Sequence, residues 1–98
     1  MNSNIKQELN EITDCIISLN KPDEIKNFML EIFTEAELET LSKRWQILGL
    51  LNKNYTQREI SNKLKVSLCK VTRGAKILKN KDSVISKYLM KGNYNGKV

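Results

Sequence analysis

Apolar residues recur every three or four positions along nearly the whole chain, and no stretch of useful length alternates apolar and polar residues as a strand would. This spacing restricts the fold most strongly, because it matches the period of an amphipathic helix. It predicts an all-α protein of six helices with short connections. The helices are expected over residues 4–19, 22–32, about 34–52, 57–64, 68–79 and 82–91.

Helix-start signals agree with this division. Pro22 suits the first turn of the second helix. Asp23 and Glu24 stabilise the same turn, because acidic side chains interact favourably with the positive end of the helix dipole. Two capping boxes follow, Thr-Glu-Ala-Glu at 34–37 and Thr-Gln-Arg-Glu at 56–59, and Ser67 is expected to cap the fifth helix. We expect a single domain over residues 1–98 with a frayed tail at 92–98.

The periodicity also predicts which side chains face inward. In the second helix these are Ile25, Phe28, Met29 and Ile32. In the third they are Leu38, Leu41, Trp45, Leu48 and Leu51, and in the last Val84, Ile85, Tyr88 and Leu89. Trp45 is interpreted as core because it lies on the apolar stripe of its helix, with a ligand platform as the alternative.

Charge is divided unevenly between the two halves of the chain. Residues 1–52 carry five basic and nine acidic side chains, a net charge of −4, whereas residues 53–98 carry twelve basic and two acidic ones, a net charge of +10. A strongly basic half favours an anionic partner, with nucleic acid the first candidate and a membrane surface the second.

Composition argues against several other classes. The chain has no histidine, which removes imidazole bases, Ser-His or Cys-His nucleophiles and His-ligated metals. Its two cysteines, Cys15 and Cys69, cannot form a four-ligand zinc site and are expected to be reduced thiols. No apolar run reaches the length of a membrane span, and the N-terminus lacks a signal-peptide core. We therefore expect a soluble cytoplasmic binding protein without catalytic activity.

The segment from Gln57 to Leu78 has the pattern of a helix-turn-helix. A small residue, Ser61, stands where the two short helices would cross, and Lys65 occupies the turn position that often carries glycine. The residues expected to lock the helices together are Ile60, Leu64, Val66, Val71 and Ile77. Candidate phosphate or base contacts around the second helix are Arg58, Lys63, Lys70, Lys76 and Lys79. The alternative is an ordinary helical hairpin with a solvated basic face.

Several short runs resemble the bacterial tryptophan repressor, itself a standard example of this motif. They are Phe33-Thr34, Leu41-Ser-Lys-Arg44, Thr56-Gln-Arg-Glu59, Val71-Thr-Arg-Gly74 and Leu78-Lys79. The similarity covers about residues 9 to 90. The part between Arg44 and Gln57 is about one residue shorter than in well-known members, as in a related Firmicute branch of uncertain ligand.

The resemblance implies an intertwined homodimer in which helices within 4–52 and 82–91 interlock with those of a second chain, while 56–79 binds operator DNA. The small size of the chain agrees with a shared core. It also implies that L-tryptophan acts as corepressor, and that the regulated genes serve tryptophan biosynthesis or uptake.

A ligand site follows by position from the same resemblance. Arg44 and Arg73 would clamp the two faces of the indole, and Gly74 would let the ring approach its helix. Thr34 of the partner chain would add a hydroxyl, with backbone carbonyls near residues 32 and 33 holding the ammonium group. Ile77 departs from the family, because the enterobacterial form has a small hydroxyl residue there.

The DNA contacts implied by the resemblance form a second set. Arg58 matches a guanine-reading arginine. Phosphate or water-mediated contact positions are matched by Gln57, Thr72 and Lys79, and an apolar pair at the helix tip by Leu68 and Cys69. Lys70 stands where the family has a small polar residue, and Ser61 where it has a lysine.

Two alternatives stay open. Ile77 and the shortened segment would suit a DNA-binding regulator of the same fold with no ligand or a different one. A basic helical interaction module that does not read sequence is the second.

Overall fold

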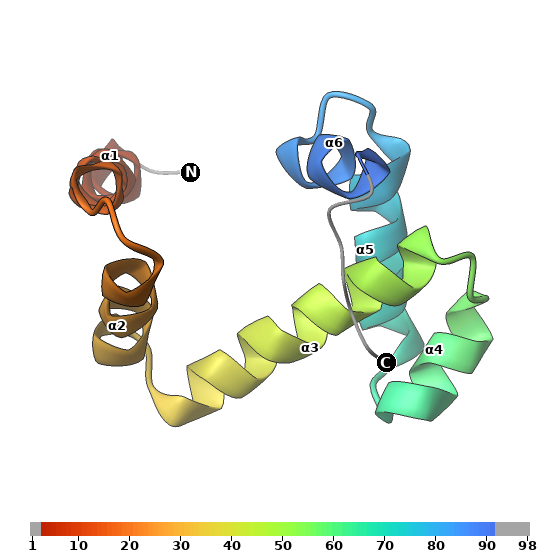
Figure 1. The fold of residues 1–98 in the computed structure, drawn as a ribbon. Helices are drawn as coiled ribbons and strands as arrows, with labels where there is room; N and C mark the ends of the chain where they lie inside the picture. The colour runs from red at the N-terminus through yellow and green to blue at the C-terminus, as the bar shows by residue number, and fades with distance from the viewer. Residues whose placement is uncertain (1–2, 92–98) are drawn as a thin grey trace. The chain divides into compact units, whose positions relative to one another are not determined.

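The computed structural model describes residues 3–91, and within them it contains six helices and no strand (Figure 1). The helices are α1 (Ser3–Ser18), α2 (Pro22–Ile32), α3 (Glu35–Asn52), α4 (Gln57–Leu64), α5 (Leu68–Lys79) and α6 (Val84–Met90). The all-α fold predicted from the apolar spacing is therefore confirmed, with helix bounds close to those expected. The predicted frayed tail, residues 92–98, lies outside the described residues.

Most helices begin at the predicted signals. Pro22 occupies the first turn of α2, with Asp23 and Glu24 beside it. The capping box before α3 is formed, because Thr34 Oγ1 accepts from the Glu37 N–H at 3.1 Å and Glu37 Oε1 accepts from the Thr34 N–H at 2.8 Å. These bonds satisfy backbone donors that a helix start leaves without an intrahelical partner.

The caps of the later helices follow the same chemistry. Before α4, Thr56 and Glu59 exchange bonds of 3.1 and 2.9 Å. Ser67 caps α5 through the Lys70 N–H, and Ser83, which the sequence analysis did not single out, caps α6 through the Ser86 N–H.

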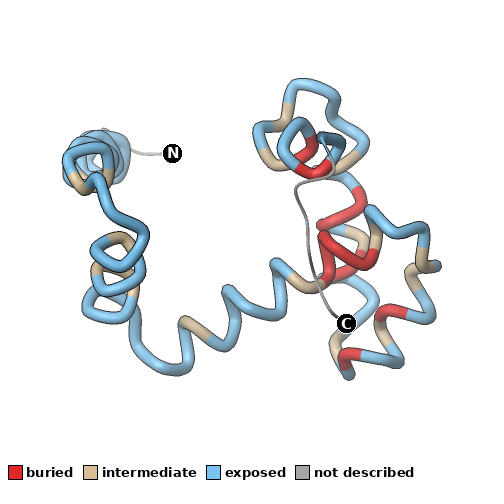
Figure 2. Tube along the Cα trace, viewed as in Figure 1, coloured by how far each residue is buried: buried red, intermediate tan, exposed pale blue. Residues whose placement is uncertain are grey.

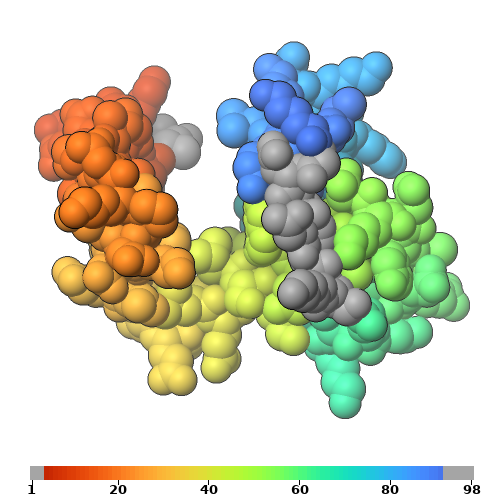
Figure 3. All heavy atoms as spheres, viewed as in Figure 1, coloured from red at the N-terminus to blue at the C-terminus, as the bar shows by residue number. Residues whose placement is uncertain are grey.

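The chain divides into two compact units, one ending at Leu38 and the other beginning at Glu39, so the boundary falls within α3. In the first unit no described residue is buried (Figure 2). Figure 3 shows side chains of α2, in orange, uncovered by the rest of this unit on the visible face. Ile32, expected to face inward, is 51% exposed, and Ile25, Phe28 and Met29 are only half-buried. These apolar faces have no complete core within their own unit.

The core lies in the second unit. It consists of Ile47, Leu50, Ile60, Leu64 and Val71, with Leu51, Tyr55 and Val66 packed against it. Of the residues predicted inward on α3, Leu48 is buried and Leu51 half-buried, but Leu41 and Trp45 are exposed. The reason is that α4 and α5 cover a broader face of the C-terminal part of α3, and this face includes Ile47 and Leu50.

The inward face of α6 was also predicted wrongly in part. Leu89 is buried as expected and Ile85 is half-buried, but Val84 is 82% exposed and Tyr88 is exposed as well. Ser86 is buried instead, and its hydroxyl donates to the Leu78 carbonyl at 3.2 Å, a hydrogen bond between α6 and the end of α5 that makes this burial tolerable.

Candidate DNA interface and ligand pocket

The turn between α4 and α5 is held by side-chain hydrogen bonds. Lys65 stands at the turn position that often carries glycine and has a left-handed φ of 55°, and its N–H donates to the Ser61 carbonyl. The Ser61 hydroxyl donates to the Val66 carbonyl at 2.7 Å. Ser61 thus has a structural role in closing the turn, in addition to its suggested place in the DNA footprint.

A lysine from α3 reaches the same turn. Lys43 Nζ donates to the Leu64 carbonyl at 3.4 Å, at the end of α4. A cation is favoured there because the last carbonyls of a helix carry its negative end. This contact connects the helix that carries Arg44 to the motif that would meet DNA.

The two helices of the motif also meet at their N-terminal ends. The Thr72 hydroxyl lies 2.9 Å from Gln57 Oε1 and 3.0 Å from the Leu68 carbonyl, so its proton can bond either oxygen. Both Gln57 and Thr72 are half-buried members of the predicted phosphate-contact set. Their contact fixes α4 against α5 where a DNA backbone would approach.

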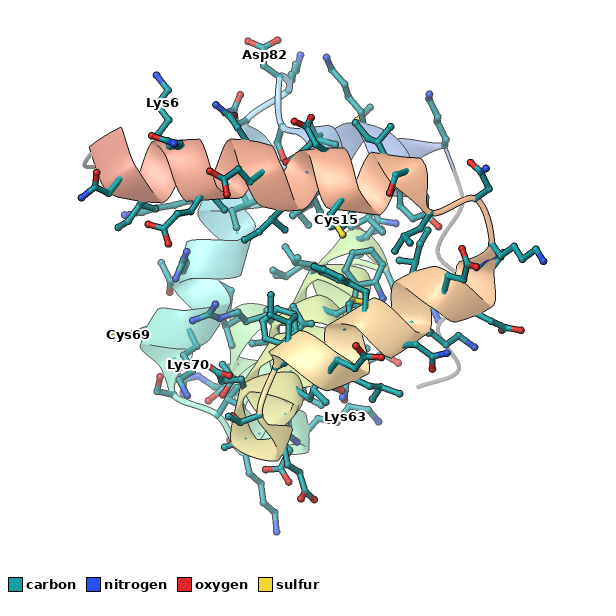
Figure 4. All side chains as sticks on the ribbon, turned by 90° about the vertical axis from the view of Figure 1, so that its left-hand side faces the viewer. Lys6, Cys15, Lys63, Cys69, Lys70 and Asp82 are labelled. Carbon is teal, nitrogen blue, oxygen red and sulfur yellow. The ribbon has the colours of Figure 1, made fainter. Side chains whose placement is uncertain are left out.

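The outer face of α5 carries a shallow groove of about 370 Å³. It is lined by Leu68, Cys69, Thr72, Arg73 and Lys76. Figure 4 labels Cys69 and Lys70 side by side at the start of α5. Arg58, Leu68, Cys69, Lys70 and Lys79 are all exposed. Five of the eight predicted DNA-contact residues are therefore accessible to a partner.

A second cavity lies between α3, α5 and α6. Its volume is about 240 Å³. It is lined by Leu41, Arg44, Trp45, Ile47, Leu48, Lys70, Arg73, Gly74, Ile77 and Ile85. Four of the five residues predicted for the ligand site are thus brought to one cavity. The fifth, Thr34, lies in the other unit, where it caps α3.

Gly74 has a packing role that the sequence analysis did not include. A Cβ at this position would lie 3.0 Å from Ile47 Cγ2, 3.2 Å from Leu51 Cδ1 and 3.6 Å from Leu48 Cδ2. The missing side chain therefore lets α5 approach α3 closely, whether or not a ligand ring also comes near.

Most of the other residues that line this cavity were not predicted from the sequence as part of a ligand site. Spacing could have identified several, because positions 41, 44, 45 and 48 share one face of α3, and 70, 73, 74 and 77 share one face of α5. By that argument Lys70, assigned only to the DNA footprint, also belongs beside Arg73. Ile85 could not be found this way, because α6 supplies it through tertiary packing.

Trp45 lines this cavity and is 40% exposed, so the prediction that Trp45 is a core residue is wrong for a single chain. Its ring lies 6.1 Å from that of Tyr88 on α6, with the planes tilted by 51°. The pair forms an aromatic wall linking α3 and α6.

The described part of the chain contains no group of three His, Cys, Asp or Glu side chains placed to hold a metal ion. None of its helices is long and apolar enough to span a bilayer.

Comparison with known proteins identifies the family. The sequence model of the family described as Trp repressor protein matches residues 7–93. A Trp operon repressor homolog of Xylella fastidiosa (strain 9a5c) is 36% identical over 87 residues, covering 88% of this chain and 92% of that protein. A Trp operon repressor homolog of Chlamydia caviae is 33% identical over 72 residues, covering 72% of this chain and 71% of that protein. No solved structure matches the chain significantly. The chain belongs to the Trp repressor family, and it is a DNA-binding transcription regulator of the repressor type rather than an enzyme.

Proposed function

We propose that this protein is a homodimeric, sequence-specific repressor whose operator binding is promoted by an aromatic corepressor, with L-tryptophan as the first candidate. The regulated genes would serve tryptophan biosynthesis or uptake, and a regulator of bacterial chromosomal DNA would act in the cytoplasm. The observation that carries the proposal is the position of Arg73, which lines both the α3–α5–α6 cavity and the groove on the outer face of α5.

The cavity suits a single aromatic ring with a short polar tail. A cavity of about 150 Å³ is enough for a benzene-sized ring, and this one holds about 240 Å³. Guanidinium groups stack on aromatic faces, and Arg44 of α3 and Arg73 of α5 both line the cavity. A ring held between them would restrain Arg73, and with it the groove that faces DNA.

The proposed dimer rests on surface that one chain leaves uncovered. Among the residues of α1 and α2 whose burial the structure describes, none is buried, although both helices carry a 3.6-period apolar stripe. A second copy interlocking with these helices would remove that apolar surface from water. Two motifs related by a two-fold axis would then favour a palindromic operator.

The direct test selects binding sites from random duplexes with L-tryptophan present, then measures affinity for the selected site with and without the amino acid. We expect discrimination of about a thousandfold over random DNA and at least about tenfold tighter binding with L-tryptophan. No discrimination would favour a basic module that does not read sequence. Discrimination without a ligand effect would favour the ligand-independent regulator, for which Ile77 in the cavity wall is the supporting observation.

Arg58 provides a residue-level test of sequence reading. It is exposed at the second position of α4, and a bidentate arginine–guanine contact discriminates by about 1–3 kcal/mol. Arg58→Ala should lose preference for the selected site while keeping residual non-specific binding, measured by fluorescence anisotropy on both duplexes. Lys81→Ala, which removes an equal charge from the α5–α6 connection, should leave the preference intact. Equal losses on both duplexes would contradict a base-reading role.

A further inference from the structure

The hydrogen bond between Thr72 and Gln57 joins the N-terminal ends of α4 and α5. The Thr72 hydroxyl lies 2.9 Å from Gln57 Oε1 and 3.0 Å from the Leu68 carbonyl, and it has one proton to donate. In a regular α-helix the Leu68 carbonyl already accepts from the N–H four residues on. Gln57 Oε1 has no other donor among residues 3–91, so the bond to Thr72 is the one that fixes the orientation of this carboxamide.

The orientation of the Gln57 carboxamide decides what the side chain offers to a partner. A carboxamide carries an acceptor oxygen on one side and an NH₂ group with two N–H donors on the other. With Oε1 turned toward Thr72, the donors of Nε2 are directed away from it, and no described residue accepts from them. Gln57 is half-buried, so these donors lie at the edge of the motif.

The approach of DNA to a helix-turn-helix places a phosphate at this edge. The second helix enters the major groove with its N-terminal residues, and the first helix crosses the sugar-phosphate backbone. Gln57 is the first residue of α4 and lies against the N-terminal part of α5 through Thr72. Exposed Arg58 follows it, and Arg73 and Lys76 line the groove beside Thr72. Glutamine is among the side chains that bond phosphate oxygens, which only accept, so a phosphate requires the outward donors.

We propose that Thr72 is a positioning residue: its hydroxyl holds Gln57 Oε1 inward, so that the Gln57 Nε2 donors face a DNA phosphate. The resemblance to known repressors places both residues among phosphate or water-mediated contacts, whereas here Gln57 touches DNA and Thr72 acts through it. The inference deepens the proposed function and rests on it only in that the α4–α5 motif binds duplex DNA.

A double-mutant cycle on the full-length protein separates an indirect role from a direct one. Affinity for the selected operator duplex is measured by fluorescence anisotropy at one salt concentration. Gln57→Ala should weaken binding by about tenfold, since it removes a bond to a charged acceptor. Thr72→Val keeps the branched shape without the hydroxyl and should weaken binding by about threefold or more. The double variant should bind within about twofold of Gln57→Ala, because Thr72 then has no carboxamide to orient.

Two further variants test the chemistry of the pair. Thr72→Ser retains the hydroxyl and should bind DNA within about twofold of the parent. Gln57→Glu can still accept the Thr72 proton, but it has no N–H to donate and brings a negative charge to the phosphate. It should bind more weakly than Gln57→Ala. Parental affinity in Gln57→Glu would mean that an acceptor faces the DNA, which would overturn the proposed orientation.

Another amide–hydroxyl pair of the chain supplies the matched control. Gln46 Nε2 donates to Ser42 Oγ at 3.0 Å on α3, outside the α4–α5 motif. Gln46→Ala breaks this pair and should change DNA affinity by no more than about twofold. Circular dichroism confirms that every variant remains folded.

The outcomes distinguish this inference from the function on which it rests. Losses that multiply in the double variant would overturn it, because Thr72 would then contact DNA itself or stabilise the motif independently of Gln57. Parental affinity in Gln57→Ala would overturn it as well and leave the repressor proposal standing. If the folded parent binds no duplex DNA, the proposed function and this inference fail together.

Discussion

At the scale of the residue, Gly74 shows how closely α5 packs against α3 where a side chain is absent. Ile47 and Leu51 occupy the space beside its Cα, at 3.0 and 3.2 Å from where a Cβ would lie. Alanine brings a favourable helix propensity of about 1 kcal/mol, which offsets part of this crowding. Valine adds two more methyl groups than alanine and keeps only a small part of that helix propensity.

We therefore expect Gly74→Val to lower the free energy of unfolding by about 1–3 kcal/mol. Gly74→Ala should lower it clearly less. Urea denaturation followed by circular dichroism measures both. Equal stability of the valine variant and the parent would mean that α3 and α5 separate there at little cost.

Glu59 offers a second prediction at this scale, through pH. Bonds from the backbone N–H and the side chain of Thr56 hold the pKa of its carboxyl below the ordinary value of 4.5. A carboxyl with a depressed folded-state pKa stabilises the protein above its unfolded pKa, and this contribution is lost as pH falls through the folded pKa.

Glu59→Gln should thus be less stable than the parent at pH 7, and the difference should shrink as pH falls below about 4.5. Urea midpoints measured from pH 7 to pH 3 give the two curves. A difference that stays constant over this range would show that the carboxylate charge does not contribute through the cap.

At the scale of the element, the α4–α5 motif depends on its turn. The Ser61 hydroxyl satisfies the Val66 carbonyl, while Lys43 from α3 bonds the Leu64 carbonyl just before it. The turn is therefore held by one hydrogen bond from inside the motif and by one from α3.

Removing the hydrogen bond from the Ser61 hydroxyl to the Val66 carbonyl should destabilise the α4–α5 motif. Ser61→Ala is expected to cost about 0.5–1.5 kcal/mol, because the Val66 carbonyl loses its protein partner. Hydrogen exchange of the α4 and α5 amides should increase more than that of α6. Asn62→Ala, at the exposed neighbouring position, is the control, and an equal response in both variants would refute a specific role for the bond.

At the scale of the whole molecule, the buried core of residues 3–91 lies in the second of the two units. The first unit, ending at Leu38, buries no described residue, and Leu30 on α2 is 62% exposed. Small proteins that cannot complete a core alone usually share one with a partner. This is the observation behind the proposed dimer.

Analytical ultracentrifugation should find a dimer at micromolar concentration. Leu30→Glu should shift it toward monomer, because a charge buried without a partner in an apolar interface is costly. Asn20→Glu makes the same charge change in the exposed connection between α1 and α2 and should leave the dimer intact. A monomeric parent protein would contradict the shared core.

The features that could be predicted from the sequence alone depend on chemistry between residues close together in the chain. The caps at Thr34, Thr56 and Ser67 join residues only three positions apart, so the sequence contains both partners of each bond. Helix periodicity and the left-handed turn at Lys65 are equally local. Six helices, a helix-turn-helix and the Arg44–Arg73 pair followed from these signals and from the family resemblance.

Burial and the full membership of the cavity required tertiary structure, because they depend on side chains distant in the sequence. The buried faces of α3 and α6 differ from those expected. On α3, Ile47 is covered by residues of α4 and α5. On α6, the Ser86 hydroxyl donates to the Leu78 carbonyl. Lys70 joined the cavity because α5 lies against α3 at Gly74. A helix pattern limits the faces that a helix can bury, but only the neighbouring elements decide which face is covered.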